Sequence, residues 1–138
     1  MKRRTVLGIN GLLLGWFFLD MTGLRVADRL IVSSAYRDDG IFFIVFLLVI
    51  ALFVFREGLG RYVLSVWLFL WFSTQFASHW VFTLFGPAEQ KNAYFSGTMK
   101  LIKSSDVYIP DLYHIVLHIL IMASFVFVVC YRPSRASD

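Results

Sequence analysis

Four apolar stretches, of 15 to 24 residues each, constrain the fold of this chain more than any other feature. They cover residues 5–24, 41–55, 62–85 and 109–131. A helix needs about 20 mainly apolar residues to cross the roughly 30 Å hydrocarbon core of a bilayer. Only 16% of the residues are charged, whereas soluble domains have about 25%. We therefore predict an all-α integral membrane protein, a four-transmembrane-helix bundle forming a single membrane domain over residues 1–138.

The ends of the four stretches carry helix signals. Lys2, Arg3 and Arg4 precede the first stretch, which has no small-residue cleavage site typical of a secretory signal, so we expect it to be retained. The second stretch would rise only roughly 22 Å as a helix, which requires a thinned bilayer or a snorkelling Arg56. The third ends at Gly86-Pro87, and the fourth begins near Pro110 and Asp111, a favourable helix N-terminus.

The connections differ in length. Residues 56–61 are short and glycine-rich, which predicts a tight antiparallel hairpin between the second and third helices. Residues 86–108 form a longer outer loop between the third and fourth helices. Its apolar content predicts that it covers the bundle as a lid, with one short helix near residues 93–103.

The basic residues predict an orientation with both termini in the cytoplasm (N-in/C-in). The short segments at the predicted inner end carry Lys2, Arg3, Arg4, Arg56, Arg61, Arg132 and Arg135. The outer connections carry Arg25, Arg29, Arg37, Lys91, Lys100 and Lys103, which Asp28, Asp38, Asp39, Glu89 and Asp106 nearly neutralise. Density of Lys and Arg in short loops is what sets orientation.

The net charge of +4 comes without a basic nucleic-acid-binding motif, so we expect contact with lipid headgroups and not with nucleic acid. We expect the plasma (inner) membrane of a bacterium as the location. The single Cys130 has no partner for an internal disulfide, and we expect it to pack as a small apolar residue.

All three histidines lie within the apolar stretches, where ionisable groups are costly and usually functional. His79 precedes the outer end of the third helix by six residues, and His114 and His118 follow the start of the fourth by about four and eight. These positions predict depths of roughly 9–10, 6 and 12 Å below the outer surface. The three imidazoles are therefore expected in the outer half of the membrane.

The helical periodicity places these histidines on polar stripes. Asp111, His114 and His118 share one face of the fourth helix, and Gln75 and His79 share one face of the third. Buried polar groups need partners, so we predict that the stripes face each other. Asp20 at the outer end of the first helix and Tyr113 are predicted supporting residues.

Three chemistries suit this predicted site. His79, His114, His118 and Asp111 are ligands that Zn, Cu or Fe accept. A b-type haem held by His79 and either His114 or His118 is the second alternative. The third is a site without metal, used for proton transfer or for a quinone or lipid headgroup.

Two functional hypotheses follow. In the first, the protein binds a metal or haem in redox or metal-assisted chemistry on a lipid-soluble substrate. In the second, the histidines are structural, and the protein is a non-enzymatic accessory subunit, or binds a lipid or small molecule. Under either hypothesis, a homo-oligomer or a larger membrane complex is a candidate assembly. The sequence contains no phosphate-binding loop, nucleophile elbow or metalloprotease motif, so it identifies neither a reaction nor a family.

Overall fold

The computed structural model describes residues 2–102, 104 and 106–132. Their helices are α1 (Arg3–Thr22), α2 (Tyr36–Phe55), α3 (Glu57–Phe85), α4 (Ala88–Tyr94) and α5 (Leu112–Val129). Two short strands, β1 (Leu24–Val26) and β2 (Arg29–Val32), form an antiparallel hairpin between α1 and α2. Lys103 and Arg135, which the orientation argument counts, lie outside the described residues.

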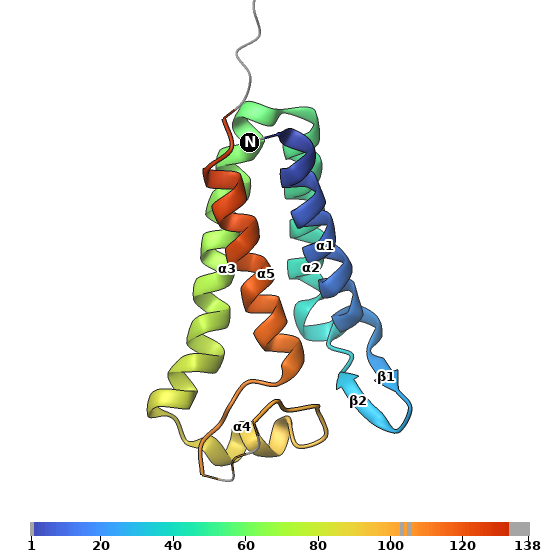
Figure 1. The fold of residues 1–138 in the computed structure, drawn as a ribbon, viewed down its shortest axis with the longest axis vertical. Coiled ribbons are helices and arrows are strands. Elements are labelled where there is room, and N and C mark those ends of the chain that lie inside the picture. The colour runs from blue at the N-terminus through green and yellow to red at the C-terminus, as the bar shows by residue number, and fades with distance from the viewer. Residues whose placement is uncertain (1, 103, 105, 133–138) are drawn as a thin grey trace, which may run out of the picture.

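The four long helices lie side by side, and each runs antiparallel to the one before it (Figure 1). The start of α1, the α2–α3 connection and the end of α5 lie at one end of the molecule, which we call the terminal end. The β1–β2 hairpin and α4 lie at the opposite end, which we call the loop end. The chain therefore enters and leaves the bundle on the same side, as four antiparallel helices require.

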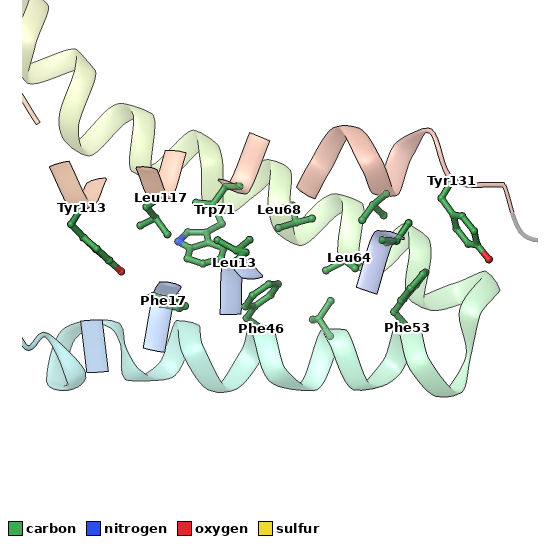
Figure 2. Close-up of a cluster of buried hydrophobic side chains, with 14 of the residues drawn as sticks. Leu13, Phe17, Phe46, Phe53, Leu64, Leu68, Trp71, Tyr113, Leu117 and Tyr131 are labelled. Atoms are coloured by element: carbon green, nitrogen blue, oxygen red, sulfur yellow. The ribbon is translucent and has the colours of Figure 1, made fainter. Parts of the chain in front are cut away.

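The core fills the space between the four long helices (Figure 2). Leu13 of α1, Phe46 of α2 and Leu68 of α3 are completely buried. The ring of Trp71 lies 4.6 Å from that of Phe17 and 5.3 Å from that of Phe46, measured between centroids. Since lipid tails are as apolar as these side chains, such packing, and not exclusion from water, holds helices together in a bilayer.

A single residue, Arg56, separates α2 from α3. The predicted glycine-rich link over residues 56–61 is therefore wrong in its boundary, because Gly58 and Gly60 belong to the first turns of α3. A Cβ atom at Gly60 would lie only 2.3 Å from the Cα atom of Phe53. The absent side chain at Gly60 lets the two helix backbones cross this closely.

Polar contacts join the helices at the terminal end. Arg3 donates a hydrogen bond to the carbonyl oxygen of Val54 at 2.6 Å, and its Nε lies 3.6 Å from a carboxylate oxygen of Glu57. Tyr131 donates its hydroxyl hydrogen to Glu57. Arg61 donates to the carbonyl oxygen of Tyr131 at 2.7 Å. These bonds connect both ends of the described chain to the α2–α3 connection.

The loop end is organised around the β hairpin, which the sequence did not predict. Residues 27 and 28 form its turn, and Ala27 has a positive φ of 53°. The segment after α4 joins the hairpin, since the amide of Met99 donates to the carbonyl of Leu30 at 3.1 Å. The amide of Leu112 then donates to the carbonyl of Met99 at 2.9 Å. The hairpin and the long loop thus hold the start of α5.

Three helices of the described chain, α1, α2 and α5, are long and apolar enough to cross a membrane. The sequence predicted four such helices, and α3 is not among the three. Its 29 residues are sufficient in length, but the polar side chains of Ser73, Thr74, Gln75, Ser78 and His79 lower its hydropathy. Membrane location is therefore indicated by three helices.

Several predicted boundaries were wrong. The second helix was expected over 41–55 but begins at Tyr36, with Asp38 and Asp39 in its first turn. Its 20 residues span roughly 30 Å, so the helix is not shorter than the hydrocarbon core, contrary to the prediction from the sequence. The short helix predicted near residues 93–103 lies instead at Ala88–Tyr94. The first and fourth helices were expected over 5–24 and 109–131, and each differs by two or three residues at its ends.

Candidate functional site

The rings of the three histidines lie next to one another where α3 and α5 approach the loop end. The imidazole of His79 lies 4.1 Å from that of His114 and 5.7 Å from that of His118, measured between ring centroids. His79 and His118 are buried, at 4% and 6% exposure. The predicted meeting of the two polar stripes is thus present in these ring contacts.

Asp111 fixes both the start of α5 and the orientation of His114. As the N-cap residue, it accepts a hydrogen bond of 3.0 Å from the backbone amide of His114. The same carboxylate oxygen lies 2.6 Å from Nδ1 of His114. A carboxylate can only accept, so Nδ1 carries the proton. In the neutral ring the lone pair is then on Nε2.

Tyr108 plays the corresponding role for His79. Its hydroxyl lies 2.6 Å from Nδ1 of His79, and its ring stacks on that imidazole at 5.9 Å between centroids. Tyr108 is fully buried. Burial, and secondarily the charge of Asp111, raises the pKa of the Tyr108 phenol. The hydroxyl is therefore protonated at neutral pH and can either donate to Nδ1 or accept from it.

His118 uses its own helix as a partner. Its Nδ1 donates to the backbone carbonyl of His114, which leaves the lone pair of the neutral ring on Nε2. That Nε2 atom is buried and has no hydrogen-bond partner among the described residues. The backbone of Gln75 on α3 also lies close to this ring. Nδ1 is thus the hydrogen-bonded nitrogen on all three rings.

Phe95, just after α4, covers the histidines from the loop end. Its ring lies 5.2 Å from that of His114, 5.7 Å from His79 and 5.8 Å from Tyr108, between centroids. Lys91 lies over the Phe95 ring at 5.9 Å, and burial lowers the pKa of the Lys91 ammonium. The long loop therefore packs onto the bundle here, as its apolar content predicted.

The predicted supporting residues have different surroundings. Asp20 is buried, and its carboxyl group lies near that of Asp39 on α2. Tyr113 stacks on Trp16 at 5.7 Å between centroids and contacts His114 with its ring edge at 5.1 Å. Gln75 has a buried side-chain oxygen without a partner in the described chain.

This arrangement offers lone pairs to a metal ion without forming a complete metal site. Within residues 2–102, 104 and 106–132, no three His, Cys, Asp or Glu side chains are grouped so that they could hold a metal ion. The neutral rings of His114 and His118 nevertheless each direct their proton to an acceptor of the protein and keep Nε2 unprotonated. The His79–His114 contact also joins the Asp111 and Tyr108 hydrogen bonds into one polar network.

Sequence reasoning missed Tyr108, Phe95 and Asp39 as neighbours of the site. Asp39 was expected in the outer connection between the first and second helices, because the early start of α2 was not predicted. Tyr108 precedes Asp111 by three residues and is a polar aromatic side chain beside a helix N-terminus, the one signal that was available for it. Comparison of the chain with protein-family models, curated proteins and solved structures gives no match.

Proposed function

We propose that the protein crosses the membrane four times, with α3 as the third span. Three observations support α3 as a span: it lies alongside the apolar helices, it is 29 residues long, and it exposes large apolar side chains. Those side chains include Val66, Phe69, Leu70 and Phe76. The polar stripe of α3 faces α5, where lipid does not reach it. We place the terminal end in the cytoplasm, because Arg3, Arg56 and Arg61 lie there in short segments.

We further propose that the imidazoles of His79, His114 and His118 bind a transition metal ion at the outer end of the bundle. The single observation that supports this proposal is the hydrogen bonding of all three Nδ1 atoms. Histidines that bind metals in proteins nearly always hold their other ring nitrogen in a bond to a carboxylate, carbonyl or similar group. Asp111, the His114 carbonyl and Tyr108 supply these partners.

The ligand chemistry favours a metal that accepts imidazole nitrogen. Zn, Cu and Fe do so, with metal–nitrogen distances of about 2.0–2.1 Å for Zn. Binding requires the rings to rotate, because in the described chain no three such ligands are grouped around a common point. A site of this kind, buried beside apolar helix surfaces, suits redox or metal-assisted chemistry on a lipid-soluble substrate.

A haem between His79 and His114 is less compatible with the geometry. Two nitrogens on opposite sides of a haem iron, each about 2 Å from it, would lie about 4 Å apart, which would put their ring centroids roughly 6 Å apart with the porphyrin between them. The two imidazoles instead contact each other at 4.1 Å, with an angle of 36° between their planes. The proposal therefore favours a metal ion held by the side chains alone.

The test is the metal content of the full-length protein, purified without chelator and also reloaded with Zn²⁺ or Cu²⁺. We expect about one ion per chain by elemental analysis. His114→Ala should lose it, while circular dichroism shows unchanged helix content. Ser78→Ala, an exposed polar substitution next to His79, is the matched control and should retain the ion. A protein without stoichiometric metal and without a haem absorption band would overturn the proposal.

A second candidate function is favoured by the absence of a preformed three-ligand group among the described residues. In this alternative the hydrogen bonds of His79, His114 and Asp111 serve only to join α3, α5 and the long loop. The protein would then be a non-enzymatic accessory or small-molecule-binding subunit of the membrane. His79→Ala and His114→Ala would lower the thermal stability of the metal-free protein, and added metal would not stabilise the wild type.

A further inference from the structure

An apolar groove runs between α3 and α5, on faces that the other helices do not cover. Its volume is about 320 Å³. Three of its lining residues, Phe69, Phe76 and Met122, are between 40% and 56% exposed, so in a membrane the groove opens to lipid. The residues that line it are Phe69, Phe72, Ser73, Phe76, Met122 and Phe125.

The groove leads toward His118. His118, Met122 and Phe125 follow one another at spacings of four and three residues and therefore share one face of α5. The ring of Phe72, a wall of the groove, contacts the His118 imidazole edge to face, at 6.0 Å between centroids. A molecule lying along the groove would thus have its end next to His118, one helical turn from Met122.

The tautomer of His118 determines which chemical group it would accept there. Its Nδ1 donates to a backbone carbonyl, so Nε2 of the neutral ring has a lone pair and no proton. This Nε2 atom is buried without a partner in the described chain, and a buried polar atom gains most from a matching partner. The matching partner of a lone pair is a donor, so a hydroxyl fits and a carbonyl or an ether oxygen does not.

The groove also selects against charge. None of its lining residues is charged, and the hydroxyl of Ser73 already donates to the carbonyl of Phe69 at 2.8 Å. A phosphate headgroup would find no cation or free donor among these residues. Four of the six lining residues are phenylalanines, whose faces and edges pack well against another aromatic ring.

We propose that this groove binds a neutral, hydrocarbon-tailed phenol or quinol, with the tail along the phenylalanines and a ring hydroxyl donating to Nε2 of His118. This assignment rests on the second candidate function, a small-molecule-binding protein, and names the class of that molecule. Because Nε2 is buried, the Phe72 ring turns aside when the ligand binds. A metal ion on Nε2 would take the same lone pair, so the phenol binds the metal-free protein.

The test uses a matched pair of ligands and a matched pair of variants. The full-length protein in lipid nanodiscs is titrated with 4-dodecylphenol and with its methyl ether, which lacks only the hydroxyl donor, and tryptophan fluorescence is recorded against empty nanodiscs. A chelator is present, so that the result is independent of the metal site. We expect saturable binding of the phenol and at least tenfold weaker binding of the ether.

The variants locate the site. Ser73→Phe fills the groove and should abolish saturable binding. Ser78→Phe is the control: it places a phenylalanine on the same helix but outside the groove. Like Ser73, Ser78 donates its hydroxyl to a carbonyl of its own helix, that of Thr74 at 2.7 Å. The Ser78→Phe variant should bind the phenol as the wild type does. His118→Ala should remove the preference for the phenol over the ether.

Equal binding of phenol and ether to the wild type would overturn the proposal, as would unchanged binding to Ser73→Phe. A fluorescence change that rises linearly with phenol concentration, as in empty nanodiscs, would mean that the phenol only partitions into the lipid. That result would also overturn the proposal. Failure of the metal proposal can be told apart from failure of the phenol proposal, because Ser73→Phe should keep the metal ion. His114→Ala should lose the ion and keep phenol binding.

Discussion

Tyr108 places its hydroxyl 2.6 Å from Nδ1 of His79, across 29 residues of sequence. This bond connects the segment before α5 with the polar stripe on α3. It is the counterpart of the bond between Asp111 and His114, which is formed within three residues. The two imidazoles in contact are therefore oriented differently: His114 by a residue of its own helix terminus, and His79 by a residue distant in the sequence.

Replacing Tyr108 with phenylalanine removes the hydroxyl and leaves the ring stack on His79 in place. If His79 is a metal ligand, the loss of its Nδ1 partner should weaken metal binding by roughly 10–100-fold. The measurement is a competition titration against a chelator of known affinity. Tyr94→Phe is the control, since Tyr94 is 70% exposed. Equal affinities of the two variants would show that Tyr108 does not orient a ligand.

Asp111 has two roles that two substitutions separate. Asp111→Asn retains an oxygen that can cap the helix, so the thermal stability of the protein should stay close to that of the wild type. Asp111→Ala removes the cap and should destabilise the protein by about 1 kcal/mol. Both variants remove the carboxylate charge beside His114 and should weaken metal binding, Asp111→Ala more strongly because it also removes the oxygen that accepts from Nδ1. If Asn matched wild type in metal affinity, the carboxylate charge would be irrelevant to the site.

The parts of this site that follow from helix periodicity were predictable from the sequence. His79, His114 and Asp111 could be placed together because each lies on a helix of clear length, and neighbouring helices run antiparallel. Tyr108 and Phe95 could not be placed, because their positions depend on the path of the loop between α3 and α5. That path is set by non-local contacts, such as the bond from Met99 to Leu30, which no periodic pattern records.

In the fold as well, some elements follow from the sequence pattern and others do not. The four long helices follow from apolar run length, yet the start of α2 does not, because Asp38 and Asp39 resemble a solvated turn. In the structure they occupy the first turn of that helix, where the helix dipole favours negative charge. The β hairpin was missed since its strands are only three and four residues long. His118 was placed on the correct face, but its bond to the His114 carbonyl depends on a rotamer.

Gly60 tests the close crossing of α2 and α3. Gly60→Ala places a methyl group 2.3 Å from the Cα atom and 2.5 Å from the nitrogen of Phe53. The two helices must separate, and we expect a loss of about 1–3 kcal/mol, as for other overpacked positions. Thermal unfolding in detergent measures it. Gly58→Ala is the matched control, because nothing lies within 4 Å of its added Cβ. Equal melting temperatures would contradict the close crossing.

The number of membrane crossings can be determined from three cysteine positions and an impermeant maleimide. Cys130 is exposed and is the single cysteine of the chain, so the wild type reports on the terminal end. In a Cys130→Ser background, Asp28→Cys reports on the β hairpin and Ser96→Cys on the segment after α4. Both are exposed positions at the loop end, and each variant has one reactive thiol.

If α3 crosses the membrane, residues 28 and 96 lie on one side and Cys130 on the other. With the proposed orientation, intact cells should be labelled at 28 and 96, and Cys130 should react only after the membrane is permeabilised. If only α1, α2 and α5 cross, residue 96 moves to the side opposite residue 28, and Cys130 joins residue 28. Labelling of all three positions after permeabilisation is the control for reactivity. The side of residue 96 relative to residue 28 therefore decides whether α3, which carries His79, is a membrane span.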